Sequence, residues 1–280
     1  MTTDVAAAAA FYRDVVGWGT REASTSNLPY TLFTAGEAPT AGLMELPEEG
    51  RKMGATPRWM GYVGVMDVYA AADRIKRLGG AVYVPPTDTN IGRISVVADP
   101  HTATFAVVDH LQTPPQQPGD SGKLGRIGWH ELFAADPDRE IAFYCELFGW
   151  QRADTKNQLA GAAYVSLSAG GQIIGGAFKK SAEEPVPYWL FYFNVEDLDA
   201  AVERVRAGGG QASCNDDELP GGLWVAHCTD PYGAEFGLQG KRGQAPKVGW
   251  STEWQGFSSR GQLVTPKPRR GSSSGEGSRS

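Results

Sequence analysis

The chain has 280 residues, of which 41% are apolar and 10% aromatic, enough for two domains that each bury a core. Its formal net charge of -6 disfavours binding to a nucleic-acid backbone, which needs a concentrated basic surface. The longest apolar run near the start, residues 5–12, is too short for a membrane span of roughly 20 residues. The 3 cysteines match neither a disulfide framework nor a zinc motif. We therefore expect a cytoplasmic globular protein without nucleic-acid or membrane partners.

The two halves of the chain repeat each other. Residues 4–18 and 136–150 are identical at six of fifteen positions, and both contain the pattern F-Y-x(4)-G-W. Residues 65–80 and 195–210 are identical at seven of sixteen positions. Because chance supplies about one match in fifteen, the halves are copies of one unit.

The repeat predicts the domain boundaries. We place the first domain at residues 1–110 and the second at 125–240, joined by a linker at 111–124 that is rich in Pro, Gln and Gly. The C-terminal extension, residues 241–280, ends in a Gly/Ser-rich run and is expected to be largely disordered after about residue 265.

The elements are clearest in the second copy, where apolar periods of two and of 3.6 residues alternate. In chain order they are a strand at 128–133, a helix at 136–148, strands at 163–167 and 173–178, a strand at 189–195, a helix at 198–207, and strands at 224–229 and 234–239. Asp136 followed by Pro137 is typical of a helix start. Each half therefore contains two βαβββ units, and the fold class is α+β with helices covering one face of each sheet.

These motifs resemble the vicinal oxygen chelate superfamily, which includes glyoxalases, bleomycin resistance proteins and dioxygenases. The resemblance rests on F-Y-x(4)-G-W, on the V-x-D-(V/L)-x-A-A start of the second helix, and on the closing D-P-x-(G/T)-A-x-F. It extends to about residue 240 and is closest to tandem-domain glyoxalase-like proteins. It implies paired βαβββ modules whose mixed sheets curl into cups, with a ligand or metal inside each cup and helices outside.

The first copy lacks a counterpart of the strand that precedes the helix in the second copy. Met1 aligns with Phe133, so the preceding strand residues have no equivalent. Two explanations stay open. Either the start codon is placed too late, or another segment fills the gap, for which residues 247–254, KVGWSTEW, are the candidate because they resemble the Ile-Gly-Trp strand start.

The resemblance also implies where a divalent metal would bind, namely through His or Gln on first strands and Glu on a last strand. The matching positions are Trp129, Leu190 and Gly237 in the second copy and Met60 and Ala106 in the first. None of these residues binds such ions through oxygen or nitrogen. We predict no metal and no other cofactor, with a divalent metal as the alternative, and expect His130 to be a core or outward-facing histidine.

Two carboxylates share the strand faces of these positions. Glu131 lies on the same face as Trp129, and Glu235 on the same face as Gly237. Such a pair can hold a hard cation or share a proton, which makes Glu131 a candidate catalytic acid/base. The alternative interpretation is that Glu131 accepts hydrogen bonds from a loop and that Glu235 lies in water.

The remaining cup residues are apolar or aromatic with a few polar groups, the composition of a ligand pocket. The candidate ligand-binding residues are Trp129, Leu190, Tyr192, Asn194, Glu235, Gln239, Met60, Tyr62 and Thr104. We predict that the chain, as a monomer or homodimer, binds a small apolar or aromatic molecule without metal. The alternatives are a glyoxalase-like lyase or dioxygenase that uses Glu131, and a non-catalytic scaffold whose cups are filled by their own side chains.

Overall fold

A computed structural model describes residues 1–25, 29–52, 54–89, 91–110, 120–153, 164–214 and 222–243, which belong to one compact unit of residues 1–244. Most of the predicted linker, the candidate strand at 247–254 and the rest of the C-terminal extension lie outside the described residues. Among the described helices, none has both the length and the apolar character needed to cross a membrane.

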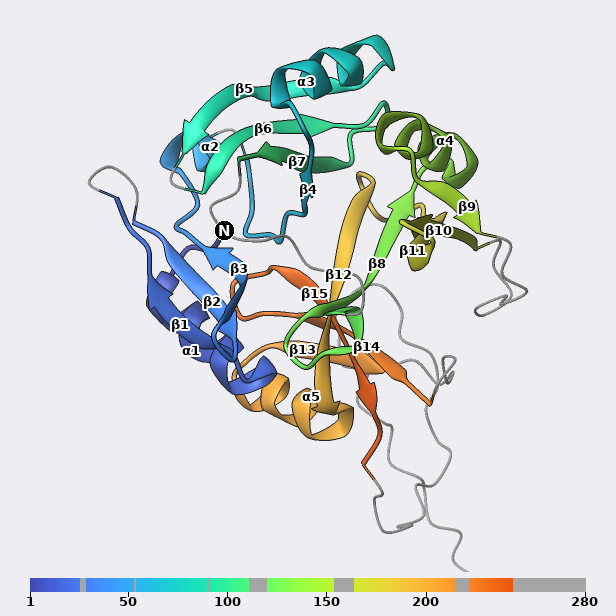
Figure 1. Ribbon diagram of the computed structural model, residues 1–280. Helices are drawn as coiled ribbons and strands as arrows, with labels where there is room; N and C mark the ends of the chain where they lie inside the picture. The colour runs from blue at the N-terminus through green and yellow to red at the C-terminus, as the bar shows by residue number, and fades with distance from the viewer. Residues whose placement is uncertain are drawn as a thin grey trace, which may run out of the picture. The chain divides into compact units, whose positions relative to one another are not determined.

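The second half forms one mixed sheet of eight strands (Figure 1). Its first module consists of β8 (Ile127–Ala134), α4 (Pro137–Phe148), β9 (Gln151–Ala153), β10 (Val165–Ala169) and β11 (Gln172–Lys179). Its second module consists of β12 (Tyr188–Asp197), α5 (Leu198–Ala207), β13 (Gln211–Cys214), β14 (Trp224–Thr229) and β15 (Glu235–Lys241). The strand order is β13-β14-β15-β12-β8-β11-β10-β9, so the two first strands, β8 and β12, pair antiparallel inside the sheet.

The first half has a similar element order, without the first strand and with one additional short helix, and its strands form two separate sheets. The first consists of β1 (Gly19–Glu22), β2 (Thr31–Ala35) and β3 (Ala38–Leu43), preceded by α1 (Val5–Val16). The second has the order β4-β7-β6-β5, with β4 (Tyr62–Gly64), β5 (Ala81–Thr89), β6 (Gly92–Ala98) and β7 (Thr104–Asp109). Two helices, α2 (Glu48–Lys52) and α3 (Val68–Arg77), precede β4 and β5.

The gap between β3 and β4 corresponds to the strand that the first copy lacks. Thr2 forms an isolated parallel bridge with Glu45, just after β3. In the second half, Ala134 at the end of β8 pairs in the same way with Lys179 at the end of β11. Thr2 thus occupies the last position of a first strand, and the described residues leave the facing edges of β3 and β4 without a neighbouring strand.

The four long helices start in the same way, because each has an aspartate at its N-cap. Asp4, Asp67, Asp136 and Asp197 each accept a hydrogen bond from a backbone N–H of the first turn. Gly17 and Gly149 then end α1 and α4 in the left-handed conformation that glycine adopts most readily. The repeated Asp and Gly positions of the sequence are therefore helix boundaries.

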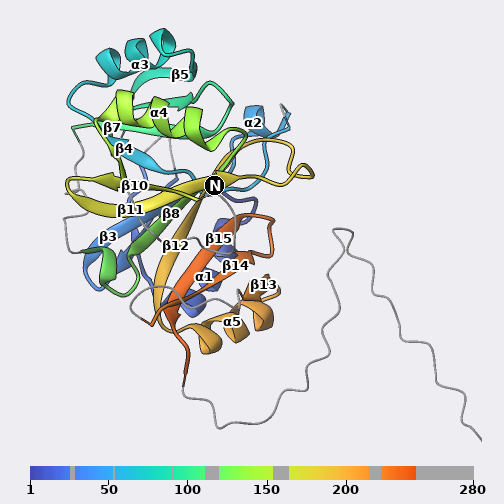
Figure 2. The same cartoon turned by 90° about the vertical axis from the view of Figure 1, so that its right-hand side faces the viewer.

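The two halves interlock instead of burying separate cores. Helix α1 packs against α5 and β12, whereas α3 packs against α4 at the opposite end of the unit, as Figures 1 and 2 show. One core cluster joins Phe11 and Phe33 of the first half to Phe236 of the second, and another joins Phe105 to Leu132. This interlocking explains why residues 1–244 form one unit, although the sequence repeat divides them in two.

Buried Trp-Tyr-Asp triads connect the halves twice. The Trp59 Nε1 donates to the Tyr12 hydroxyl (2.8 Å), which donates to the carboxylate of Asp230 in the other half (2.9 Å). Trp189, Tyr144 and Asp99 repeat these two bonds at 2.9 and 3.1 Å. The F-Y and D-P motifs therefore meet across the halves.

The structure confirms the predicted α+β class with tandem copies of mixed, curled sheets. The predicted helix at 198–207 and strand at 224–229 have the bounds of α5 and β14. Two short edge strands, β9 and β13, were not predicted, because a run of three or four residues is too short for its alternation to be a clear signal.

Candidate functional site

The predicted cup residues of the second half lie on one face of its sheet. Trp129 pairs with Tyr192, and Tyr192 pairs with Gly237, so these three form a row across β8, β12 and β15. Glu131 pairs with Leu190 in the neighbouring row. Paired residues of a sheet point to the same face, which brings all five together.

The residues at the implied metal positions do not fit a metal ion. The Trp129 Nε1 donates to the Tyr164 hydroxyl (3.0 Å), Leu190 is buried among apolar side chains, and Gly237 lies against the ring of Tyr192. None of these groups supplies an oxygen or nitrogen lone pair to a cation. In the described part of the chain, no three His, Cys, Asp or Glu side chains are grouped as metal ligands.

Glu131 instead belongs to a hydrogen-bonded cluster of side chains inside the second cup. Its carboxylate accepts a short hydrogen bond from the Tyr192 hydroxyl and a longer one from Tyr164 (3.5 Å). The Nε2 of His227, on β14, lies 2.5 Å from the same Tyr192 hydroxyl. Burial raises the pKa of Glu131 and lowers the pKa of His227, so both groups favour their neutral forms.

The cluster is a chain of groups that can share protons. Tyr192 bridges Glu131 and His227, and the Oε2 of Glu131 lies 4.0 Å from the Nε2 of His227. The His227 side chain is 33% exposed, whereas that of Glu131 is 11% exposed, so the imidazole is the outer end of the chain. Neither His227 nor Tyr164 was among the predicted site residues, because no sequence motif surrounds them. The alternation of side chains along β14 could have indicated His227, since it places this residue opposite Gly237 on the face of the cup.

The other predicted residues of the second cup have different surroundings. Asn194 accepts a hydrogen bond from Gln239 (2.6 Å) and donates to the backbone oxygens of Ser121 and Lys123, which ties the start of β8 to the sheet. Glu235 is exposed. Phe133, Leu190, Tyr192 and Val225 pack together as a buried apolar cluster in this cup.

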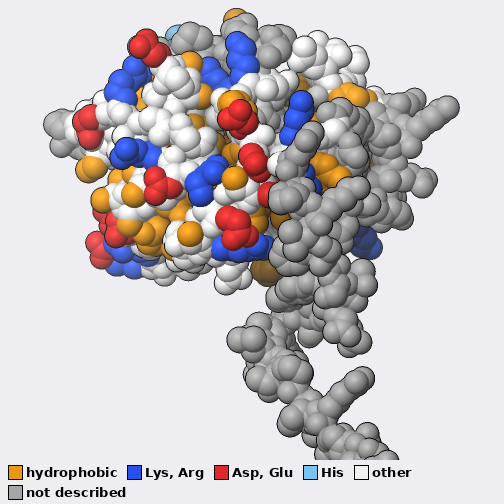
Figure 3. Space-filling model, turned by 90° about the horizontal axis from the view of Figure 1, so that it is seen from below, with side chains coloured by type: hydrophobic (Ala, Val, Ile, Leu, Met, Phe, Trp, Pro, Cys, Tyr) orange, Lys and Arg blue, Asp and Glu red, His pale blue; other side chains and the backbone are white. Residues whose placement is uncertain are grey.

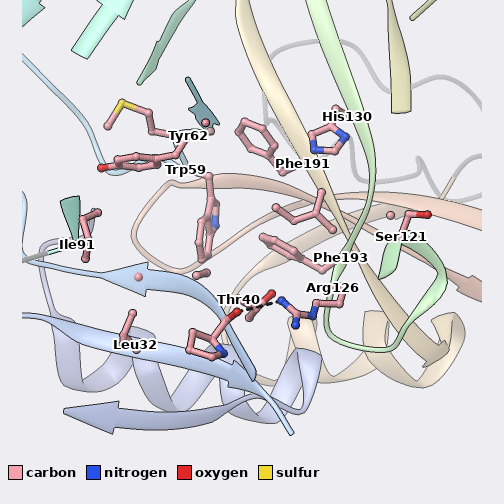
Figure 4. A pocket seen from close by; sticks show the side chains of 18 of the residues that line it. Leu32, Thr40, Trp59, Tyr62, Ile91, Ser121, Arg126, His130, Phe191 and Phe193 are labelled. Atoms are coloured by element: carbon pink, nitrogen blue, oxygen red, sulfur yellow. Dashed lines mark hydrogen bonds between the residues drawn. The ribbon is translucent and has the colours of Figure 1, made fainter. Parts of the chain in front are cut away.

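A cavity of about 510 Å³ lies instead at the gap between β3 and β4. Its walls come from the first cup, through β2, β3 and β4, and from the β8 and β12 strands of the second half (Figure 4). The lining residues include Tyr30, Leu32, Pro39, Thr40, Gly42, Trp59, Met60, Gly61, Tyr62, Gly64, Arg126, Ile127, His130, Ile174, Phe191 and Phe193.

Five aromatic side chains contribute to the cavity wall, namely Tyr30, Trp59, Tyr62, Phe191 and Phe193. The Trp59 and Phe193 rings are in edge contact at 5.0 Å, and the Phe191 ring lies edge-on to His130 at 5.8 Å. Two tyrosine hydroxyls add polar groups. Burial raises the pKa of Tyr62, and burial with the nearby Tyr62 raises the pKa of Tyr30 to about 12, so both phenols are neutral at pH 7.

Two of the three candidate ligand-binding residues of the first cup lie at the cavity. Met60 and Tyr62 line the cavity, whereas Thr104 is outside its lining and hydrogen-bonds to the backbone of Thr102. His130 faces this cavity and not the second cup, because its strand partner is Phe191 on the opposite face from Glu131.

On the described part of the face seen in Figure 3, Lys and Arg side chains are interspersed with Asp and Glu, and no large patch of one charge is visible. The candidate sites are therefore the cavity and the Glu131 cluster described above.

Comparisons with known proteins agree with this architecture. The Glyoxalase/Bleomycin resistance protein/Dioxygenase superfamily model matches residues 1–107 and 126–238. The chain is 31% identical over 249 residues to a Mycobacterium tuberculosis protein named "Putative glyoxylase CFP32", covering 85% of this chain and 90% of the relative. It is 29% identical over 248 residues to the anthracycline biosynthesis protein DauV of Streptomyces sp. (strain C5), covering 84% and 88%.

Two solved structures share the fold at low identity. An Mn(II)-bound glyoxalase from Novosphingobium aromaticivorans has a TM-score of 0.59 at 15% identity, covering 86% of this chain and 79% of that one. The 2,3-dioxygenase LapB from Pseudomonas sp. KL28 has a TM-score of 0.58 at 11% identity, covering 86% and 89%. With both halves matched by the family model, the chain belongs to the glyoxalase/bleomycin resistance protein/dioxygenase superfamily.

Proposed function

We propose that this protein binds a small aromatic molecule in the cavity between the halves, without a metal ion. The cavity of about 510 Å³ carries the proposal, because it has the volume and the aromatic lining of small-molecule sites. The residues at the implied metal positions support the proposal that no metal ion is needed, because Trp129, Leu190 and Gly237 have no side-chain atom that could bind a cation. An open cavity also favours binding over a scaffold with filled cups.

A blocking substitution tests this proposal. Gly64 lines the cavity, and a Cβ added there would meet no atom within 4 Å, so we expect the ring of Gly64→Phe to enter the cavity with little disturbance of the fold. We expect the dye 1-anilinonaphthalene-8-sulfonate to bind the wild type with one site and Gly64→Phe at least 10-fold more weakly. Gly122→Phe is the control, because Gly122 is equally open and lies outside the cavity lining. Equal binding by both variants would place the ligand elsewhere.

Elemental analysis tests the metal-free part separately. We expect the purified protein to contain far less than one equivalent of metal, before and after incubation with Mn, Fe, Ni or Zn salts. One tightly held ion per chain would contradict it.

An enzyme is the second candidate, and the Glu131-Tyr192-His227 cluster is the observation that favours it. A buried carboxyl with a raised pKa and a hydrogen-bonded phenol is the kind of group that acts as a general acid/base. The relatives include both a glyoxylase and an anthracycline biosynthesis protein by name, so they do not decide between binding and catalysis. Turnover of a hemithioacetal or a catechol that disappears in Glu131→Gln, while dye binding persists, would establish this candidate.

A further inference from the structure

Resting on the proposed binding function, we infer that the ligand is an aromatic acid that also carries a hydroxyl group. His130 accepts the hydrogen bond of that hydroxyl, and Arg126 binds the acid. His130 lies on β8 and Arg126 directly precedes this strand. Both residues line the cavity, and neither belongs to the predicted cup site.

The hydrogen bonding of His130 determines what its free nitrogen can do. Its Nδ1 lies 2.8 Å from the backbone oxygen of Ile174, and a carbonyl only accepts, so Nδ1 carries the proton. Burial lowers the pKa of this imidazole, which keeps the second nitrogen, Nε2, unprotonated. Nε2 is therefore an acceptor, and no described residue donates to it. A ligand hydroxyl or N–H is its natural partner.

Arg126 provides the complementary cation. One of its N–H groups donates to the backbone oxygen of Pro39 on the cavity wall (2.9 Å), which holds the guanidinium in place (Figure 4). Among the described side chains, no carboxylate lies within ion-pair distance of Arg126. A guanidinium has five donors in a planar fork, so several stay free to bind a carboxylate.

The two polar groups of the cavity wall are separate in the chain. Arg126 directly precedes β8, and His130 is the fourth residue of this strand, with the β-bulge at Gly128 between them. We therefore assign them to two different groups of the ligand. A flat molecule of two fused rings, with its acid and hydroxyl at opposite ends, offers one group to each residue and lies against the Trp59, Phe191 and Phe193 rings.

Titration calorimetry with four naphthalene probes measures separately how much the hydroxyl and the acid contribute to binding. The probes are 6-hydroxy-2-naphthoic acid, its 6-methoxy analogue, its methyl ester and naphthalene itself. On the wild type, we expect methylation of the hydroxyl and esterification of the acid each to weaken binding about 10-fold. In His130→Phe, methylation of the hydroxyl should no longer weaken binding, whereas esterification of the acid should still do so. In Arg126→Gln, esterification should no longer weaken binding, whereas methylation should still do so. Arg139→Gln, at an exposed position on α4, is the control.

The outcomes distinguish this inference from the proposed function. If naphthalene binds and neither substituent improves its affinity, the inference is overturned and the binding function stands. If no probe binds, both fail. Should His130→Phe or Arg126→Gln not fold, the wild-type comparison of the four probes still decides the matter, and Arg126→Lys, which keeps the charge, should retain part of the preference for the acid.

Discussion

Tyr12 and Tyr144 occupy equivalent positions in the two copies, and each is almost fully buried with its hydroxyl between an indole N–H and a carboxylate. Burial and the neighbouring aspartates raise the pKa of both phenols, which therefore stay neutral donors. A buried hydroxyl in this position satisfies two groups at once, because it accepts from tryptophan and donates to aspartate.

Removing either hydroxyl should therefore be costly. We expect Tyr12→Phe and Tyr144→Phe each to lower the free energy of unfolding by about 1–3 kcal/mol, since the aspartate and the indole both lose a buried partner. Urea unfolding monitored by circular dichroism measures this change. Tyr69→Phe, at an exposed site, is the control and should change stability little. A negligible effect at Tyr12 and Tyr144 would contradict the importance of the triads.

Glu131 gives the protein a specific dependence on pH. Its native pKa is raised above the ordinary value of 4.5, so its stability contribution is complete below pH 4.5 and is lost as the pH rises through the native pKa. We expect Glu131→Gln to gain stability relative to the wild type as the pH rises from 4.5 through the native pKa of Glu131, by about 1.4 kcal/mol for each unit of pKa shift. Urea unfolding at several pH values checks this.

His227 should show the opposite sign. Its native pKa is lowered from 6.5, so the wild type loses stability relative to His227→Gln as the pH falls below 6.5. If the stability differences between the wild type and both variants do not change with pH, then burial does not shift the pKa values of Glu131 and His227.

At the scale of elements, glycines of the second cup leave space for side chains of the neighbouring strands. A Cβ on Gly237 would overlap the Tyr192 ring, and one on Gly128 would overlap the amides of Asn194 and Gln239. Gly128 also lies at a β-bulge, where the register between β8 and β12 shifts. The Tyr192 ring therefore occupies the space beside Gly237 in the implied metal row.

Adding one methyl group should affect Gly237 in the second cup more than Gly64 in the first cup. We expect Gly237→Ala to lower the free energy of unfolding by about 1–3 kcal/mol through overpacking. Gly64→Ala on β4, where nothing lies within 4 Å, should have an effect of less than about 0.5 kcal/mol. Thermal unfolding of both variants gives the comparison, and equal melting temperatures would mean that the second cup repacks freely.

The element pattern was predictable from the sequence, whereas the contacts between elements were only partly so. Asp caps, glycine stops and alternating strands are local signals, so α5 and β14 were predicted at their observed bounds. Alternation also places Trp129, Glu131 and Tyr192 on one face. The position of His130 was not predictable, because the cavity wall that it joins is built by the other copy, and strand spacing carries no information on contacts across the halves.

At the scale of the whole molecule, neither half has a complete core of its own. Helix α1 buries Phe11 against Phe236, and Phe105 of the first half packs against Tyr144 of the second. Separating the halves would expose these aromatic side chains together with the triad carboxylates. We therefore expect one cooperative unfolding transition for the full chain.

Splitting the chain within the predicted linker tests this interdependence. We expect residues 120–243 expressed alone to aggregate or to bind hydrophobic dyes without a sharp melting transition, and co-expression with residues 1–119 to restore a 1:1 complex. Size-exclusion chromatography and thermal unfolding provide the measurements. An isolated half that is monomeric and melts like the full chain would disprove the dependence.

The crossed triads also bear on how the protein diverged from its ancestor. Two identical chains that closed each other's sheets through Tyr12-Asp230 and Tyr144-Asp99 contacts would form a symmetric homodimer. In such a dimer every substitution appears twice, so both cups must change together. Fusion of the genes removes that constraint. One cup could then fill with Glu131, Tyr192 and His227 while the other kept an open cavity, so the duplication separates the evolution of stability from the evolution of binding.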